Sequence, residues 1–310
     1  MPLYILKRLA VAVPTLLGLA FVTFLLLRAI PGDPALGLVG ERADPAAVEA
    51  IRRELGQDRP LPAQFIGYLT LLAKGNLGRS YYTRREVTKD ILEKFPNTLK
   101  LALAAMLIAT SFGMLLGILS AVARGGPLEK VFSGLALAGI SLPVFWVGLI
   151  FMLVFAFWLP WMPPSGMGGG RLIYLALPAA TLGLNSAAYI ARITRMSLIE
   201  ALGAQYVMTA RAKGLSPFVV VAKHALRNAM IPVITLIAID FGSYLNGSVL
   251  TETIFGWDGL GRYALDGIMK RDYPVILGTV LVGSAFLVFF NMLADIAYAY
   301  IDPRIRYGKK

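Results

Sequence analysis

The chain has 310 residues, of which 57% are hydrophobic and only 15% are charged, and its mean hydropathy is +0.68. Soluble domains carry about 25% charged residues, so this composition argues against a soluble enzyme and against a disordered chain. There is no Cys and only one His, His224, which excludes disulfides, thiol catalysis and metal sites built from Cys or from several His. The net charge of +12 suits either nucleic acid or a membrane surface, and the positions of the charges must decide.

Six apolar runs are long enough to cross a bilayer, which requires about 20 mostly apolar residues. The first lies within residues 1–30; it is longer than the apolar part of a signal peptide and lacks a cleavage site, so we expect a retained membrane helix. The other five predicted spans are about 99–123, 131–159, 172–195, 228–251 and 273–300. A single run of this kind could be a buried core helix, but six in one chain predict an all-α polytopic membrane protein.

The basic residues are distributed unevenly between the two sides of this predicted membrane domain. If the N-terminus is cytoplasmic, the short outer segments hold four basic residues, Arg171, Arg262, Lys270 and Arg271. The inner segments hold 14, namely Lys7, Arg8, Arg124, Lys130, Arg192, Arg195, Arg211, Lys213, Lys223, Arg227, Arg304, Arg306, Lys309 and Lys310. Cytoplasmic loops of membrane proteins are enriched in Lys and Arg, so both termini, including the tail 303–310, are predicted to be cytoplasmic. Topology thus accounts for the charge, and nucleic acid needs no part in the explanation.

Residues 31–96 are predicted to form a helical extracytoplasmic loop. Asp44 and Pro45 suit the N-cap and first position of a short helix that Gly56 closes. A second short helix is expected over 61–73, where Phe65 and Tyr68 are interpreted as packing residues rather than ligand contacts.

The inner segment 197–228 is predicted to form two short helices joined by a hinge. A helix-like stretch over 197–212 is broken by Lys213, Gly214 and Leu215, and Ser216 then caps a second helix that starts at Pro217. Small residues in this elbow would allow another protein to approach closely. Its basic character would equally suit a helix lying on lipid, and periodicity alone leaves both alternatives open.

Several short motifs, in order along nearly the whole chain, resemble one transporter family. They are Pro31–Pro34, Gly75–Ser80, Thr209–Leu215, His224–Ala229 with Pro232, Thr251–Phe255, Gly259–Arg262, Arg271–Pro274 and Asp302–Tyr307. Together they resemble the permease subunits of ATP-binding-cassette (ABC) importers, above all the family that carries dipeptides, oligopeptides, glutathione and nickel. The inner loop departs from the general importer form, which begins Glu-Ala-Ala, because Glu200-Ala201 lies too far upstream to be that start.

The resemblance implies a permease of the type I importer fold in the cytoplasmic (inner) membrane of a prokaryote. Its implied partners are a second homologous permease subunit, two ABC ATPase subunits and an extracytoplasmic substrate-binding protein, besides membrane lipid. The chain contains no Gly-x-x-x-x-Gly-Lys-Ser/Thr phosphate loop, so it binds no cofactor on this interpretation, and the partner ATPases use the ATP and Mg. The resemblance also makes the elbow the coupling region that docks on an ATPase, through Ala210, Lys213, Gly214, His224, Leu226 and Arg227.

Ionisable and amide groups inside predicted spans are candidates for the translocation pathway. Asp240 sits about halfway along the fifth span, and the amides considered with it are Asn185, Asn246 and Asn291. The segment after that span is expected to contribute to an outer gate or a binding-protein contact through Glu252, Phe255, Trp257 and Arg262, although the two rings would also suit a simple interfacial belt. No catalytic residue and no metal site is predicted.

The expected function is import of di- or oligopeptides, with glutathione or chelated nickel as the alternative cargo. A secondary transporter would show inverted repeats and a midplane ion site, and the sequence shows neither. An intramembrane hydrolase is disfavoured because His224 lies in the inner segment rather than in a span.

Overall fold

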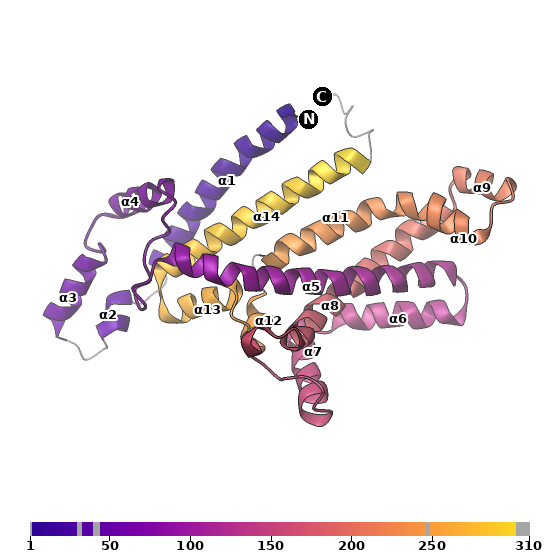
Figure 1. The fold of residues 1–310 in the computed structure, drawn as a ribbon. Coiled ribbons are helices and arrows are strands. Elements are labelled where there is room, and N and C mark those ends of the chain that lie inside the picture. Colours follow the sequence, from indigo (N-terminus) through magenta and orange to yellow (C-terminus); the bar gives the residue numbers. More distant parts are fainter. Residues whose placement is uncertain (1, 30–32, 40–43, 246–247, 302–310) are drawn as a thin grey trace. The chain divides into compact units, whose positions relative to one another are not determined.

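The computed structural model describes residues 2–29, 33–39, 44–245 and 248–301, and the side chains within 10–29, 33–39, 44–245 and 248–293. Within these ranges the chain is built from helices, and the long ones are α1 Pro2–Ala29, α5 Val87–Val122, α8 Ile173–Leu202, α11 Leu226–Leu245 and α14 Tyr273–Ile301 (Figure 1). Five helical stretches in the described chain are long and apolar enough to cross a membrane, or six if one bent pair counts as a single span. The predicted all-α class is confirmed.

The predicted third span is not one straight helix. It consists of α6 Pro127–Ser141 and α7 Val144–Phe151, which continues as a π-helical segment Met152–Trp158, and the two halves are bent by 103°. The break falls at Leu142 and Pro143. Proline has no backbone N–H to donate, and it drives the residue before it into extended backbone, as seen at Leu142 with φ −87° and ψ 133°. The prediction of one helix over 131–159 was therefore wrong.

The predicted fifth span is also interrupted before its expected end. Among the described residues helix α11 runs to Leu245, Ser248 is not helical, and a short helix, α12 Val249–Ile254, follows; α13 Leu260–Lys270 comes next. Between α7 and α8, a short 3₁₀ turn covers Gly168–Gly170.

The segment after α1 carries the two predicted short helices, α3 Pro45–Glu54 and α4 Leu61–Ala73. A further short helix, α2 Pro34–Val39, precedes them and was not predicted. The Asp44 side chain accepts a hydrogen bond from the Ala46 backbone N–H, and Gly56 adopts a positive φ of 66° after α3. The Phe65 ring packs on Phe21 and Phe24, with centroid separations of 5.2 and 5.3 Å, which confirms its packing role.

The described backbone divides into two compact units. The first comprises the described residues of Met1–Leu99, Leu245–Thr253 and Asp258–Val288, and the second those of Lys100–Tyr244, Ile254–Trp257 and Phe289–Lys310. In the second unit α5 and α8 pack closely because glycines leave room for the facing backbone. A Cβ built on Gly117 would lie 2.6 Å from the Ala191 carbonyl oxygen, so a side chain there would force the helices apart.

Candidate functional site: the elbow between α8 and α11

The elbow predicted within 197–228 corresponds in the structure to residues 203–225, between the end of α8 and the start of α11. Gly203 ends α8, and Ala204 then adopts extended backbone with ψ 150° before α9 Gln205–Ala212 begins. The sequence predicted one continuous helix over 197–212, and this prediction was wrong. The last turn of α8 and the eight residues of α9 are separate helices, so α9 is a distinct element with a turn on each side.

The second turn of the elbow is fixed by a backbone motif that requires glycine. After α9 the Gly214 N–H donates to the Arg211 carbonyl at 2.9 Å and the Leu215 N–H donates to the Ala210 carbonyl at 3.4 Å. This pair of bonds is the Schellman arrangement, which places the residue after the C-cap in the left-handed region. Gly214 has φ +76°, where a side chain is strained, and the space around it is open.

The return arm, which we define as the helical stretch 217–225 before α11, begins as the sequence predicts. The Ser216 side chain accepts a hydrogen bond from the Val219 backbone N–H, Pro217 occupies the first position, and the helix continues without a break into α11. Its stretch Val220–Ala225 is π-helical and contains His224. Such π segments are rare and are often found at functional sites.

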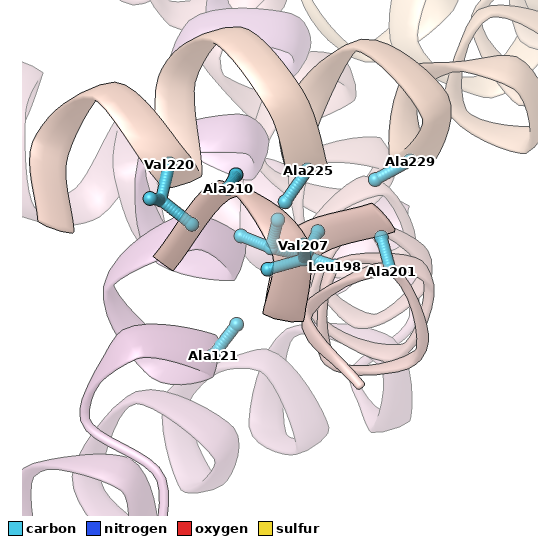
Figure 2. Close-up of a cluster of buried hydrophobic side chains, with 8 residues drawn as sticks. All are labelled: Ala121, Leu198, Ala201, Val207, Ala210, Val220, Ala225 and Ala229. Carbon is cyan, nitrogen blue, oxygen red and sulfur yellow. The ribbon is translucent and has the colours of Figure 1, made fainter. Parts of the chain in front are cut away.

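The side of the elbow that packs against α5 and α8 has its own hydrophobic core. Figure 2 shows side chains from α5, α8, α9, the return arm and the start of α11 meeting in one cluster: Ala121, Leu198, Ala201, Val207, Ala210, Val220, Ala225 and Ala229. Val207 and Leu198 are completely buried there. Five of the eight members are alanines, and small side chains let the helical backbones approach closely. The elbow is thus a packed part of the second unit, anchored on α5 and α8.

The exposed residues of the elbow are both basic and apolar. Arg211, Lys213 and Gly214 are exposed, and so are Met208 at 60% and Phe218 at 79% of their surface. Exposed large apolar side chains beside charges are typical of contact surfaces for a partner or a membrane. Met208 and Phe218 were missed by the sequence reasoning, because an apolar residue in a mostly apolar chain carries no signal until its exposure is known.

The six predicted coupling residues do not all face outward. Lys213, Gly214 and Arg227 are exposed, while His224 and Leu226 are partly buried. Ala210 is buried in the inner cluster, so it supports the elbow rather than offering a surface to another protein.

The intramembrane candidates are placed on three helices of the second unit. Asp240 on α11 has a buried Oδ2 atom without a hydrogen-bond partner among the described residues, and Ser186 on α8 interacts with the same carboxylate. One turn further along, the Tyr244 hydroxyl lies 2.6 Å from the Ser186 hydroxyl and 3.1 Å from the Leu182 carbonyl oxygen. Ser186 and Tyr244, not predicted from the sequence, therefore join Asp240 in one polar contact between α8 and α11.

The amide candidates do not join this contact. The Asn185 Nδ2 atom donates to the Gly139 carbonyl at 3.2 Å, which ties α8 to α6, and Asn291 is exposed on α14. Asn246 lies outside the described residues. Within the described part of the chain, no three His, Asp or Glu side chains gather into a potential metal site.

The two rings predicted at the outer gate are buried. Trp257 packs with Leu101 and Leu182, and Phe255 lies against Gly148, where an added Cβ would come within 3.1 Å of the ring. These two rings therefore form neither an exposed interfacial belt nor an exposed contact surface of this chain. Their position after the fifth span gave no indication of this burial.

Glu252 is also completely buried, in the first unit, where it binds three donors. Its carboxylate accepts from the Thr98 hydroxyl at 3.0 Å, from the Arg262 N–H at 3.0 Å and from the Gly261 N–H. Burial raises the pKa of the Glu252 carboxyl above its ordinary value of 4.5, although these hydrogen bonds act in the opposite direction. Arg262 contributes its backbone to this site, and its side chain is partly exposed.

Comparison with known proteins gives concordant results over the whole chain. The model of the family described as "binding-protein-dependent transport system inner membrane component" matches residues 113–307, and that of its N-terminal part matches 1–102. The chain is 43% identical to the di/tripeptide transport system permease protein DppB of Pseudomonas aeruginosa (strain UCBPP-PA14), over 99% of each chain. It is also 43% identical to the glutathione transport system permease protein GsiC of Pectobacterium atrosepticum, over 98% of this chain and 99% of that one.

Solved structures agree on the fold. An inward-facing MetNI methionine ABC transporter chain superposes with a TM-score of 0.59 at 18% identity, covering 68% of this chain and 96% of that chain. An amino acid ABC transporter chain gives a TM-score of 0.55, also at 18% identity. The family matches, the relatives and the apolar helices together make this an integral, multi-pass membrane protein, and the chain belongs to the binding-protein-dependent transport system inner membrane components, the permease subunits of ABC importers.

Proposed function

We propose that this chain forms one half of the translocation pathway of an importer for di- or oligopeptides. Two kinds of relative, at 43% identity each, are named for di/tripeptide and for glutathione transport, and glutathione is itself a modified tripeptide. A peptide carries both charges and variable side chains, so its route should be weakly polar. Asp240 with Ser186 and Tyr244 is a sparse polar site of this kind.

In the proposed assembly a second homologous permease, two ATPases and one extracytoplasmic binding protein complete the transporter, and both termini of this chain are cytoplasmic. Family membership implies the ATPase and binding-protein partners. ATP and Mg are used by the ATPases, since this chain contains no phosphate loop.

The elbow is the proposed contact with one ATPase. One observation supports this assignment above all. The elbow has its own buried hydrophobic core, which includes Ala210, and it also exposes Met208, Lys213 and Phe218. An interfacial helix resting on lipid would need no such core. Partner docking is therefore favoured over the lipid-lying alternative.

In this proposal, the movement that the ATPase imposes on the elbow is transmitted through the two helices connected to it, α8 and α11. Helix α8 enters it at Leu202, and the return arm continues into α11. The same two helices carry Ser186, Asp240 and Tyr244, which meet across their interface. A displacement of α9 by the ATPase would thus act on the helix pair that holds these intramembrane polar groups.

Cargo is tested by reconstituting the chain with its partner subunits in proteoliposomes and measuring uptake and ATP hydrolysis with a labelled dipeptide, a tripeptide, glutathione and a nickel chelate. We expect dipeptide or tripeptide to stimulate both activities. Stimulation by glutathione alone would change the cargo assignment, and stimulation by the nickel chelate alone would reject the peptide class. Transport driven by an ion gradient without ATP would reject the ABC assignment and support a secondary transporter.

A further inference from the structure

A cavity of about 680 Å³ lies within the first unit, beside the end of α1. Its wall is made by the last turn of α1, by α3 and α4, by the segment after α4 and by the start of α14. The residues that matter for its chemistry are Arg28, Arg59, Gln64, Tyr68 and Tyr273. None of them takes part in the elbow or in the polar contact between α8 and α11.

The cavity lies where two apolar spans end. Arg28 is the penultimate residue of α1, whose apolar stretch Ala10–Ala29 has 20 residues, and Tyr273 is the first residue of the apolar stretch of α14. The Arg28 guanidinium lies 4.7 Å from the centre of the Tyr273 ring, so the two span ends meet. Twenty helical residues extend about 30 Å, the thickness of the hydrocarbon core. The cavity is therefore at the depth of the lipid headgroups, whichever side of the membrane it faces.

The groups that contact the positively charged side chain of Arg28 are neutral. Its guanidinium donates to the Gln64 Oε1 atom, at 3.1 Å from Nε, and stacks on the Phe24 ring at 5.0 Å. Among the described residues no carboxylate forms an ion pair with Arg28. The acidic groups near this cavity are engaged elsewhere, since Glu54 pairs with Arg84 at 2.7 Å and Asp272 accepts from the Ser80 hydroxyl.

A second donor is available at the same cavity. The Tyr68 hydroxyl is buried and has no hydrogen-bond partner among the described residues. Burial raises the pKa of Tyr68 to about 12, so the hydroxyl keeps its proton and can donate. A buried donor without an acceptor is costly, and an anionic oxygen in the cavity would satisfy it.

The surroundings favour a lipid over a soluble anion. Helix α4 has no charged residue, is too short to span a bilayer, and exposes Leu61, Ile66 and Leu71 on different sides around its axis. Apolar side chains around α4, together with exposed Phe21 on α1, therefore give acyl chains groups to contact next to a cation at headgroup depth. A free phosphate or a peptide carboxylate would use the cation but not these apolar groups.

We propose that this cavity, the α1–α4 cavity, binds the phosphodiester headgroup of a membrane phospholipid, with Arg28 and Tyr68 as donors to the phosphate oxygens. Arg59, exposed at its rim, would favour a headgroup with net negative charge. The proposal does not depend on the identity of the cargo or on the role of the elbow.

The test is native mass spectrometry of the full-length chain, purified in mild detergent with phosphatidylglycerol and phosphatidylethanolamine, comparing the parent with Arg28→Gln and Tyr68→Phe. The matched control is Arg53→Gln, which removes a 71% exposed arginine of α3. We expect the parent and the control to retain phosphatidylglycerol, and each cavity variant to bind it about tenfold or more weakly, since a charge-assisted bond is lost. Thermal unfolding checks that each variant folds, and if Arg28→Gln does not, Tyr68→Phe alone decides.

Competitors distinguish the possible ligands. Inorganic phosphate or glycerophosphate at millimolar concentration should leave the bound phospholipid in place. Displacement by either anion would show a simple anion site, and displacement by a tripeptide would show a cargo site. Equal lipid retention in the parent, both cavity variants and Arg53→Gln would also overturn the proposal.

Discussion

The Glu252 carboxylate accepts a hydrogen bond from the Arg262 backbone N–H at 3.0 Å and thereby closes the N-terminus of α13 from the preceding helix α12. Gly259 stands at the N-cap of α13 and has no side chain to satisfy the first N–H groups. Thr98 completes the arrangement, since its hydroxyl accepts from the Leu260 N–H at 2.8 Å while donating to Glu252. Glu252 and Thr98 therefore act as a cap on α13, and Thr98 comes from a distant part of the sequence.

Replacing Glu252 by Ala should destabilise the first unit. It leaves the Arg262 N–H and the Thr98 hydroxyl without their acceptor in a buried site, at a cost of about 1–3 kcal/mol per group. Thermal unfolding in detergent measures the effect. Asp266→Ala, which removes an exposed carboxylate of α13, is the control and should change little. Equal unfolding temperatures for the two variants would show that the cap is dispensable.

The raised pKa of Glu252 predicts a specific pH dependence. The folded chain holds the proton more tightly than the unfolded chain, so protonation favours folding as the pH falls through the folded-state pKa towards the ordinary value of 4.5. Above the folded-state pKa this contribution is lost. Between neutral pH and 4.5, the unfolding temperature of the parent should rise relative to that of Glu252→Gln, which cannot titrate. Parallel pH profiles for both proteins would contradict this assignment.

Gly214→Asp should abolish coupled transport while the chain still inserts. The side chain meets open space, so the intramolecular cost is confined to the left-handed backbone, about 1–2 kcal/mol. Gly75→Asp is a matched control, because Gly75 also follows a helix, has φ +69° and faces open space. ATPase retention on pull-down and cargo-stimulated hydrolysis in proteoliposomes are the measurements. Lys213→Ala should have a smaller effect, since an exposed charge contributes little alone. If Gly214→Asp and Gly75→Asp have the same effect on transport, the elbow is not the contact through which the ATPase drives transport.

Asp240→Asn should change the preference among peptides of different charge without impairing assembly. The amide keeps the shape of the carboxylate but removes its charge from the contact with Ser186. Asp240→Leu should reduce transport of all peptides if water or cargo reaches the site. Asn185→Leu serves as a control, because Asn185 bonds the α6 backbone and not this contact. Competition between cationic, neutral and anionic dipeptides is the readout, and an unchanged ranking in both Asp240 variants would make Asp240 structural.

Cysteine labelling should place the segment after α1 and the elbow on opposite sides of the membrane. The chain has no Cys, so Arg53→Cys and Lys213→Cys each introduce a single exposed thiol. An impermeant thiol reagent should label only Arg53→Cys in intact cells and both variants after permeabilisation. Labelling of Lys213→Cys in intact cells would reject the proposed orientation.

The sequence by itself determined the helical class, the approximate spans and the short capped helices, because these depend on local signals. Apolar length identifies a span, and the Asp44-Pro45 and Ser216-Pro217 pairs mark helix starts wherever they occur. Gly214 was likewise identified from the sequence as a hinge, and its positive φ agrees with that prediction.

Only the tertiary structure decided which side of each element is covered. The burial of Ala210, Phe255 and Trp257, and the exposure of Met208 and Phe218, depend on neighbours that are distant in sequence. The break at Pro143 had a local cause, but its 103° bend is a matter of how α6 and α7 each pack on α8. In a chain that is mostly apolar, hydrophobicity does not distinguish core residues from surface residues. The contacts of Glu252 and Arg28 likewise become known only from the packed helices, because their partners lie on other elements.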